Sequence, residues 1–117
     1  MKLRGHCILS HGFESGPDAT KVTALAEVAE RFGWTHERPD YSDLDARRDI
    51  GPLGDVPQRL SRLRALAQAA SGRGSLVMAG SSLGAYISAR ISLEITTQAL
   101  FLMAPPLTMG RLPALDA

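Results

Sequence analysis

A serine stands between two glycines near the middle of the sequence, in the pentapeptide GSSLG at residues 80–84. An apolar run at 75–79 precedes it, and a stretch with helical periodicity follows it. A G-x-S-x-G turn between a strand and a helix holds its central residue in a strained conformation, so that the hydroxyl projects from the edge of the sheet. Ser82 is therefore predicted to be a nucleophile of the kind that carries out acyl transfer.

The two glycines of the motif have a steric role in this interpretation. Gly80 and Gly84 lie where the strand and helix backbones pass closest, and a Cβ atom at either position is expected to clash with its neighbour. Ser82 is expected at the positive end of the helix, where backbone N–H groups point at a developing oxyanion. An isolated G-x-S-x-G also occurs in ordinary surface turns, and the flanking patterns are what favour a nucleophile.

The elements that position this turn follow from the hydrophobic pattern. Strands are predicted at residues 5–10, 34–38, 75–79 and 99–104, and helices at 17–33, 55–70 and 83–93. The polar composition of WTHER at 34–38 indicates a strand near the sheet edge. The uninterrupted apolar run ALFLMA at 99–104 indicates a fully buried strand that ends at Pro105 and Pro106. Strands and helices that alternate in this way predict a mostly parallel sheet in a single three-layer α/β/α domain spanning residues 1–117.

Two charged segments are interpreted as surface. Residues 40–54 carry mixed charges, glycines and a proline, and are predicted to form a long surface connection, with a lid or rim over the site as the alternative. The second helix is expected to begin at Asp55, a favourable N-cap. Its basic residues Arg59, Arg62 and Arg64 are predicted to form a solvated face.

The composition excludes several classes of function. Thirteen basic and twelve acidic residues leave a net charge of +1, so no nucleic-acid partner is expected, and no apolar run is long enough for a membrane span. Glycines 72 and 74 precede a strand instead of following it, which does not fit a dinucleotide or P-loop site, and no cofactor and no metal are expected. The single cysteine, Cys7, is expected to be buried in the first strand, as suits a cytoplasmic protein.

Two motifs together resemble the α/β-hydrolase superfamily: HGF at 11–13 after the first strand, and GSSLG at 80–84 after the third. The sequence is most similar to the amino-terminal portion of the small lidless bacterial esterase-like members, and the resemblance covers most of the chain. It implies an α/β-hydrolase-like fold, and hydrolysis of a small carboxylic ester or thioester through an acyl-enzyme.

The resemblance also implies roles for individual residues. Ser82 is the acyl nucleophile, and the backbone N–H groups of Phe13 and Leu83 form the oxyanion hole. Four further residues are expected to support the site: His11, Gly12, Gly80 and Gly84. A direct role of His11 in proton transfer is the less favoured alternative to its support of the oxyanion loop.

The sequence departs from the superfamily pattern in its acid and base. The superfamily places an acid and then a histidine downstream of the nucleophile, whereas here no histidine follows His36. The carboxylates after Ser82 are Glu94 and Asp116, and neither resembles the acid position. The catalytic triad therefore has no evident acid or base in this sequence.

Three explanations are open. The chain is the amino-terminal portion of a longer hydrolase that continues with further strands, or it is a degenerate hydrolase-fold protein that binds without acyl chemistry, or a second copy supplies the missing parts through an uncovered sheet edge. The first is favoured, because a sheet that ends on ALFLMA leaves an apolar strand uncovered. Homo-oligomers formed through that edge are expected under the third.

Overall fold

Four parallel strands form the central sheet, in the order β2-β1-β3-β4. The computed structural model describes residues 5–72 and 74–103. The strands are β1 (Gly5–Ser10), β2 (Thr35–Glu37), β3 (Ser75–Ser81) and β4 (Ala99–Met103). Strands β1 and β3 lie side by side at the centre, and the short polar strand β2 lies at an edge, as its composition predicted.

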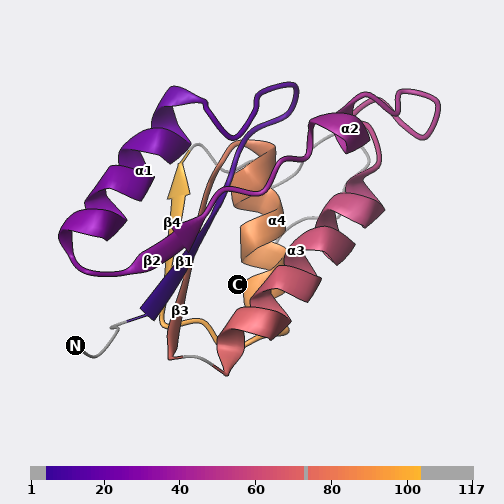
Figure 1. Ribbon diagram of the computed structural model, residues 1–117. Coiled ribbons are helices and arrows are strands. Elements are labelled where there is room, and N and C mark those ends of the chain that lie inside the picture. The colour runs from indigo at the N-terminus through magenta and orange to yellow at the C-terminus, as the bar shows by residue number, and fades with distance from the viewer. Residues whose placement is uncertain (1–4, 73, 104–117) are drawn as a thin grey trace.

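Helices cover both faces of this sheet (Figure 1). They are α1 (Thr20–Arg31), α2 (Ser42–Asp45), α3 (Val56–Ser71) and α4 (Leu83–Ser92). Helix α1 packs on one face, whereas α3 and α4 pack on the other. The predicted three-layer α/β/α architecture with a mostly parallel sheet is confirmed.

Alternate side chains of β1 and β3 enter two different cores, as the period of a strand requires. The core under α1 receives Cys7, Leu9, Val77 and Ala79. The core under α3 and α4 receives Ile8, Leu76 and Met78. Both central strands are therefore buried on both faces, which is why their sequences read as continuous apolar runs.

Helix α3 begins where the sequence indicated. The side chain of Asp55 accepts a hydrogen bond from the backbone N–H of Gln58 at 3.1 Å, so it satisfies one of the first-turn donors of the helix. Pro57 lies in the first turn, where its missing N–H costs no hydrogen bond. The resulting helix packs against the sheet and beside α4.

The prediction of a surface connection at 40–54 is wrong for its first part. Residues 42–45 form the short helix α2, and three side chains around it are buried: Tyr41, Leu44 and Asp45. Residues 46–50 are exposed, as predicted. The error has a physical cause, because the mixed charges of this segment include one carboxylate that is paired inside the protein.

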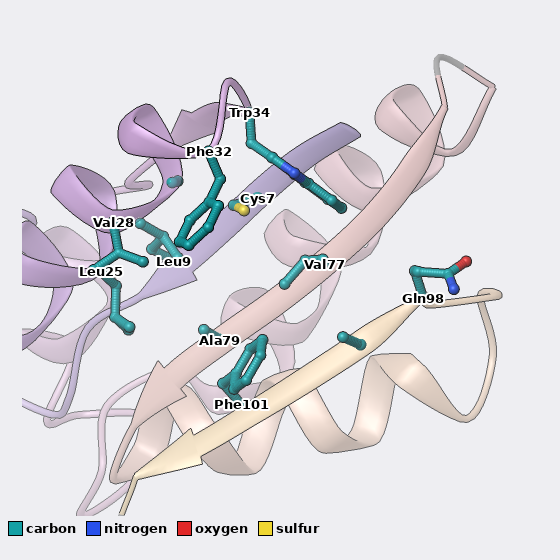
Figure 2. A pocket seen from close by; sticks show the side chains of 12 residues that line it. Cys7, Leu9, Leu25, Val28, Phe32, Trp34, Val77, Ala79, Gln98 and Phe101 are labelled. Carbon is teal, nitrogen blue, oxygen red and sulfur yellow. The ribbon is translucent and has the colours of Figure 1, made fainter. Parts of the chain in front are cut away.

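Strand β4 is only half-buried, so the prediction of a fully buried strand is also wrong within the described residues. Phe101 of β4 and Phe32, which follows α1, are each more than half exposed. Between them lies an apolar cavity of about 380 Å³ on the α1 face of the sheet, with Leu9 and Val77 in its floor (Figure 2). The expected strand end at Pro105 and Pro106 falls outside the described residues.

Among the described residues, no helix is both long and apolar enough to cross a membrane.

Candidate active site

Ser82 occupies the turn between β3 and α4 with a left-handed backbone, at φ 55° and ψ −118°. Its N–H donates to the carbonyl of Met103 in β4 at 2.9 Å, and its own carbonyl accepts from the N–H of Tyr86 in α4 at 3.1 Å. The backbone of Ser82 therefore continues the hydrogen bonding of the sheet through its N–H and begins the hydrogen bonding of the helix through its carbonyl. A non-glycine residue in this conformation is strained, and strain of this kind concentrates at functional sites.

The two motif glycines lie at very close backbone approaches. A Cβ atom on Gly80 would lie 2.4 Å from the carbonyl carbon of Gly84. A Cβ atom on Gly84 would lie 2.1 Å from the carbonyl oxygen of Ser10. The start of α4 is therefore pressed against both β3 and the end of β1, and only glycine fits at either contact.

The loop after β1 lies beside the GSSLG turn, because the parallel register pairs Ser10 with Gly80 at the carboxyl ends of β1 and β3. A Cβ atom on Gly12 would lie 3.5 Å from the Cβ of Ser82. Phe13 follows, and the guanidinium of Arg48 lies over its ring at 5.5 Å from the centroid. The sheet register thus brings the HGF loop and the GSSLG turn together.

An open cavity of about 300 Å³ lies between these two segments and the start of α1. Its lining is His11, Gly12, Phe13, Ser15, Ala19, Thr20, Lys21, Val22, Ser81 and Ser82. The partly exposed Ser82 forms one wall of this cavity, and the HGF loop forms another. A small ligand in the cavity would contact both.

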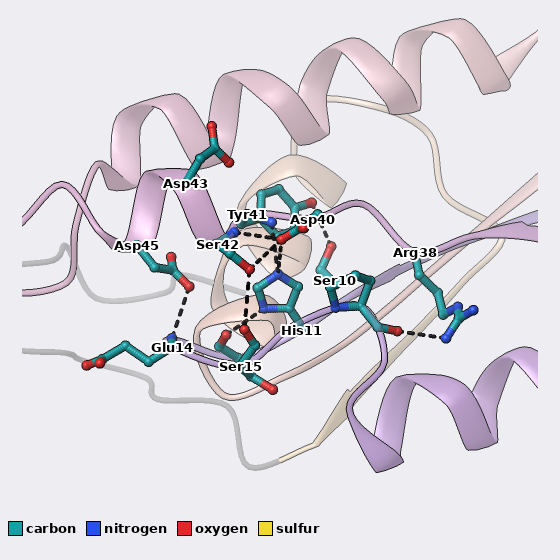
Figure 3. Close-up of polar contacts among 12 residues, drawn as sticks. Ser10, His11, Glu14, Ser15, Arg38, Asp40, Tyr41, Ser42, Asp43 and Asp45 are labelled. Atoms are coloured by element: carbon teal, nitrogen blue, oxygen red, sulfur yellow. Dashed lines mark hydrogen bonds and ion pairs between the residues drawn. The ribbon is translucent and has the colours of Figure 1, made fainter.

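His11 is buried, and both of its ring nitrogens are engaged (Figure 3). Nδ1 donates to the carbonyl of Gly12 at 2.7 Å, and Nε2 accepts from the backbone N–H of Tyr41 at 2.9 Å. Burial lowers the pKa of this imidazole, which favours its neutral form. No ring nitrogen is left to take a proton from Ser82, so the geometry favours support of the loop over proton transfer.

Sequence reasoning missed a buried arginine behind this loop. Arg59 of α3 is fully buried, and its Nε and Nη2 donate to the two carboxylate oxygens of Asp45, each at 2.9 Å. Its Nη1 donates to the carbonyl of His11 at 3.0 Å, and Nη2 donates also to the carbonyl of Gly12 at 3.0 Å. The guanidinium lies 4.4 Å from the centroid of the Tyr41 ring. The loop carbonyls are thus held by a charged group inside the protein.

The prediction that all three basic residues of α3 form a solvated face is wrong for Arg59. Arg62 and Arg64 are partly exposed and pair with carboxylates at the surface. Arg59 instead follows Val56 by three residues and precedes Leu63 by four, so it lies on the apolar stripe of the helix. That spacing is the sequence signal that could have identified it.

Asp45, the partner of Arg59, also binds the backbone of the same loop, after Phe13. Its Oδ2 accepts a hydrogen bond from the backbone N–H of Glu14 at 3.0 Å (Figure 3). Glu14 has a left-handed backbone, with φ 56°, and shares this property with Ser82 among non-glycine residues of the described ranges. The ion pair formed by Arg59 and Asp45 therefore contacts the backbone of residues 11, 12 and 14.

No base for Ser82 is found in the part of the chain that the structure describes. His6 bonds to Glu37 at 2.6 Å, and His36 lies 3.3 Å from Glu30. Both histidines belong to the sheet, on β1 and β2, and neither lines the cavity at Ser82. Asp116, the last carboxylate of the sequence, lies outside the described residues, and within 5–72 and 74–103 no group of three or more metal-ligating side chains gathers.

A family model described as "Uncharacterised protein family (UPF0227)" matches residues 6–112. The chain belongs to this family. No curated protein matches the sequence significantly.

The solved structures that are similar to this UPF0227 member include one of high and one of low sequence identity. A candidate hydrolase of the α/β superfamily from Xanthomonas campestris pv. campestris is 72% identical, with a TM-score of 0.95 over 97% of this chain and 66% of that one. The chain thus spans just under two thirds of the length of that relative. An acetylxylan esterase has a TM-score of 0.66 at 14% identity, over 96% of this chain and 68% of its own, which concerns the fold alone. The UPF0227 chain is α/β-hydrolase-like.

Proposed function

We propose that this chain carries the nucleophile and the oxyanion hole of a serine hydrolase that cleaves a small carboxylic ester or thioester. The observation that carries the proposal is the strained left-handed conformation of Ser82 at a strand-to-helix turn, in the wall of a cavity shared with the HGF loop. The 72% identity to a protein described as a candidate α/β hydrolase supports it.

The proposed reaction passes through an acyl-enzyme. The Oγ of Ser82 attacks the substrate carbonyl carbon while its proton passes to a base. The negative charge that forms on the carbonyl oxygen accepts hydrogen bonds from the backbone N–H groups of Phe13 and Leu83. The C–O or C–S bond then breaks, and the leaving group takes the proton. Water hydrolyses the acyl-serine by the same sequence of steps, and the proposal invokes no metal and no cofactor.

The general base and its acid are proposed to come from a segment outside residues 1–117. The three histidines of the sequence are engaged elsewhere, as described above. The Xanthomonas relative has about one third of its length outside the region that this chain matches, which is room enough for both residues. Further proposals are a small-molecule ester partner and a cytoplasmic location, the latter supported by a lone buried cysteine.

Labelling with a fluorophosphonate tests the proposal. Residues 1–117 and the protein made from the complete coding sequence are each treated with the reagent, and the adduct is located by peptide mass. We expect labelling at Ser82 in the complete protein, with loss in Ser82→Ala and retention in Ser81→Ala. Ser81 is the matched control, because it precedes Ser82 in the same turn and lines the same cavity.

Either of two results would reject the proposal. Equal losses in the two variants would place the nucleophile elsewhere in the turn. A folded complete protein that is never labelled would instead favour a hydrolase-fold protein that binds a ligand without acyl chemistry.

A further inference from the structure

We infer that Arg59 and Asp45 are positioning residues for the oxyanion hole, and that they aim the backbone N–H of Phe13 at the carbonyl group that Ser82 attacks. The inference rests on the proposed function, because an oxyanion hole has meaning only if Ser82 acts as a nucleophile. It adds two buried residues to the site, neither of which belongs to the HGF or GSSLG motif.

The argument begins with one peptide unit. The carbonyl of Gly12 and the N–H of Phe13 belong to the same planar peptide, and the described residues contain no cis peptide bonds. In a trans peptide the oxygen and the hydrogen point in opposite directions. The direction of the Gly12 carbonyl therefore sets the direction of the Phe13 N–H.

Three donors hold that carbonyl. The Gly12 oxygen accepts from Nδ1 of His11 at 2.7 Å, from Nη2 of Arg59 at 3.0 Å and from the N–H of Ser15 at 3.2 Å. With the carbonyl turned toward these three donors, the Phe13 N–H points away from them. Among the described residues we find no acceptor for this N–H, which suits a donor reserved for a ligand in the cavity that Phe13 lines.

The ion pair holds the loop on both sides of Phe13. Arg59 binds the carbonyls of His11 and Gly12 before it, and Asp45 accepts from the N–H of Glu14 after it. The pair is itself rigid, because two parallel hydrogen bonds of 2.9 Å join two planar groups that are at most 3% exposed. Residues 12–14 are thus fixed from both ends by one buried unit.

The charge of Arg59 also strengthens the donor that it positions. A hydrogen bond from a guanidinium to a carbonyl draws electron density along the peptide and makes the N–H of the same peptide a better donor. Core filling alone does not require these charges, since apolar residues of similar volume often replace a buried ion pair without loss of stability. The hydrogen bonds to the loop are what an apolar pair would lack.

The test measures ester hydrolysis by the complete protein with p-nitrophenyl acetate. The informative variant is the double substitution Arg59→Met with Asp45→Leu, because it leaves no unpaired buried charge and so keeps the protein folded. We expect kcat to fall at least tenfold, toward the hundredfold loss typical of a missing oxyanion donor, with KM within about threefold of wild type. Arg59→Lys keeps the positive charge but loses the planar guanidinium that binds Asp45 and both carbonyls at once, so its kcat should be intermediate.

A second readout separates positioning from a general structural effect. A trifluoromethyl ketone adds to the serine hydroxyl and places a negative oxygen in the oxyanion hole, so its affinity should fall by about the same factor as kcat. Arg64→Met is the matched control, because Arg64 lies on the same helix and pairs with Glu94 at the surface, away from the cavity. Both readouts should be unchanged in this control.

The possible failures are distinguishable. A folded double variant with the kcat and ketone affinity of wild type would overturn the inference and leave the proposed function intact. A wild-type protein that hydrolyses no ester and is not labelled at Ser82 would overturn the proposed function, and the inference with it.

Discussion

The backbone N–H of Tyr41 donates to Nε2 of His11 at 2.9 Å, so this nitrogen presents a lone pair. Nδ1 must then carry the proton that is donated to the carbonyl of Gly12. The two contacts define one neutral tautomer, in which the imidazole bridges the start of the HGF loop and the segment before α2. Protonation of Nε2 would turn the Tyr41 contact from a hydrogen bond into a repulsion between two donors.

This contact predicts that stability is lost in mild acid. Burial lowers the pKa of His11 below its ordinary value of 6.5, so below pH 6.5 the unfolded chain takes up a proton that the folded protein does not. The free energy of unfolding should not depend on His11 above pH 6.5. It should fall by up to about 1.4 kcal/mol per pH unit as the pH drops from 6.5 to the lower folded-state pKa.

Urea unfolding at a series of pH values from 7.5 to 5 measures this loss. His11→Gln is the comparison, because its side-chain oxygen can accept from Tyr41 and does not titrate. The other two histidines are present in both proteins and cancel in the difference. An equally steep decline in His11→Gln would show that His11 is not the source.

Gly84→Ala should destabilise the fold severely. The new methyl group would lie 2.1 Å from the carbonyl oxygen of Ser10, and neither backbone can yield without moving α4 or β1. We expect a loss of about 3 kcal/mol in the free energy of unfolding. Gly72→Ala is the control, since a Cβ there meets nothing within 4 Å, and it should change stability by less than about 0.5 kcal/mol. Similar effects of the two substitutions would contradict the close approach.

Ser82→Gly should stabilise the protein while abolishing fluorophosphonate labelling. Glycine tolerates the positive φ of this turn, so it releases strain that costs on the order of 1–3 kcal/mol. Part of that gain is offset by the greater flexibility of glycine in the unfolded chain, which leaves a net gain of about 1 kcal/mol. Thermal and urea unfolding give the sign directly.

The neighbouring serine provides the opposite expectation. Ser81 lies at the end of β3 and does not have a positive φ, so glycine relieves no strain there. Ser81→Gly should therefore lower the free energy of unfolding by about 1 kcal/mol. If both glycine substitutions destabilise the protein equally, the backbone of Ser82 in the GSSLG turn is not strained.

Asp45→Ala should cost about 3–5 kcal/mol in the free energy of unfolding, because it leaves the fully buried Arg59 without its counter-charge. The substitution of both partners by apolar residues should recover most of that loss. A substitution of Glu94, whose pair with Arg64 is exposed, should leave the urea midpoint within error of wild type. The prediction fails if the buried and the exposed carboxylates prove equally dispensable.

Two exposed phenylalanines on the α1 face of the sheet predict self-association of residues 1–117. Phe101 is 57% exposed and Phe32 is 59% exposed, and both border the apolar cavity of Figure 2. Sedimentation velocity should show oligomers that Phe101→Gln reduces. Leu93→Gln is the control, because Leu93 is 61% exposed but does not line that cavity. A wild-type chain that sediments as a monomer at high concentration would contradict the prediction.

Most of the fold was predictable, because the elements of this sheet leave periodic patterns. Strands β1 and β3 are buried on both faces and read as apolar runs, and the pentapeptide between β3 and α4 leaves no room for a loop. Strand β4 was harder to predict. An apolar run shows that the side chains favour burial, but it does not show which element covers them, and Phe101 is half exposed.

The residues that form and hold the candidate site were only partly predictable from the sequence. His11, Gly12 and Ser82 belong to local motifs, so a short window of sequence contains the signal. The contact of Arg59 with Asp45 joins residues 14 positions apart on different helices, and charged residues are ordinarily assigned to the surface. The helical spacing of Arg59 could have indicated its burial, whereas the identity of its partner depends on how the chain turns at α2.

The contact between Gly84 and the carbonyl of Ser10 has a consequence for protein engineering. It fixes the start of α4, which directly follows Ser82, against the end of β1, which the HGF loop follows. The remaining wall of the cavity comes from the start of α1, with Thr20 and Lys21 at the surface. Libraries that randomise these α1 positions should therefore change which molecules are accepted, while the reactive parts keep their mutual placement.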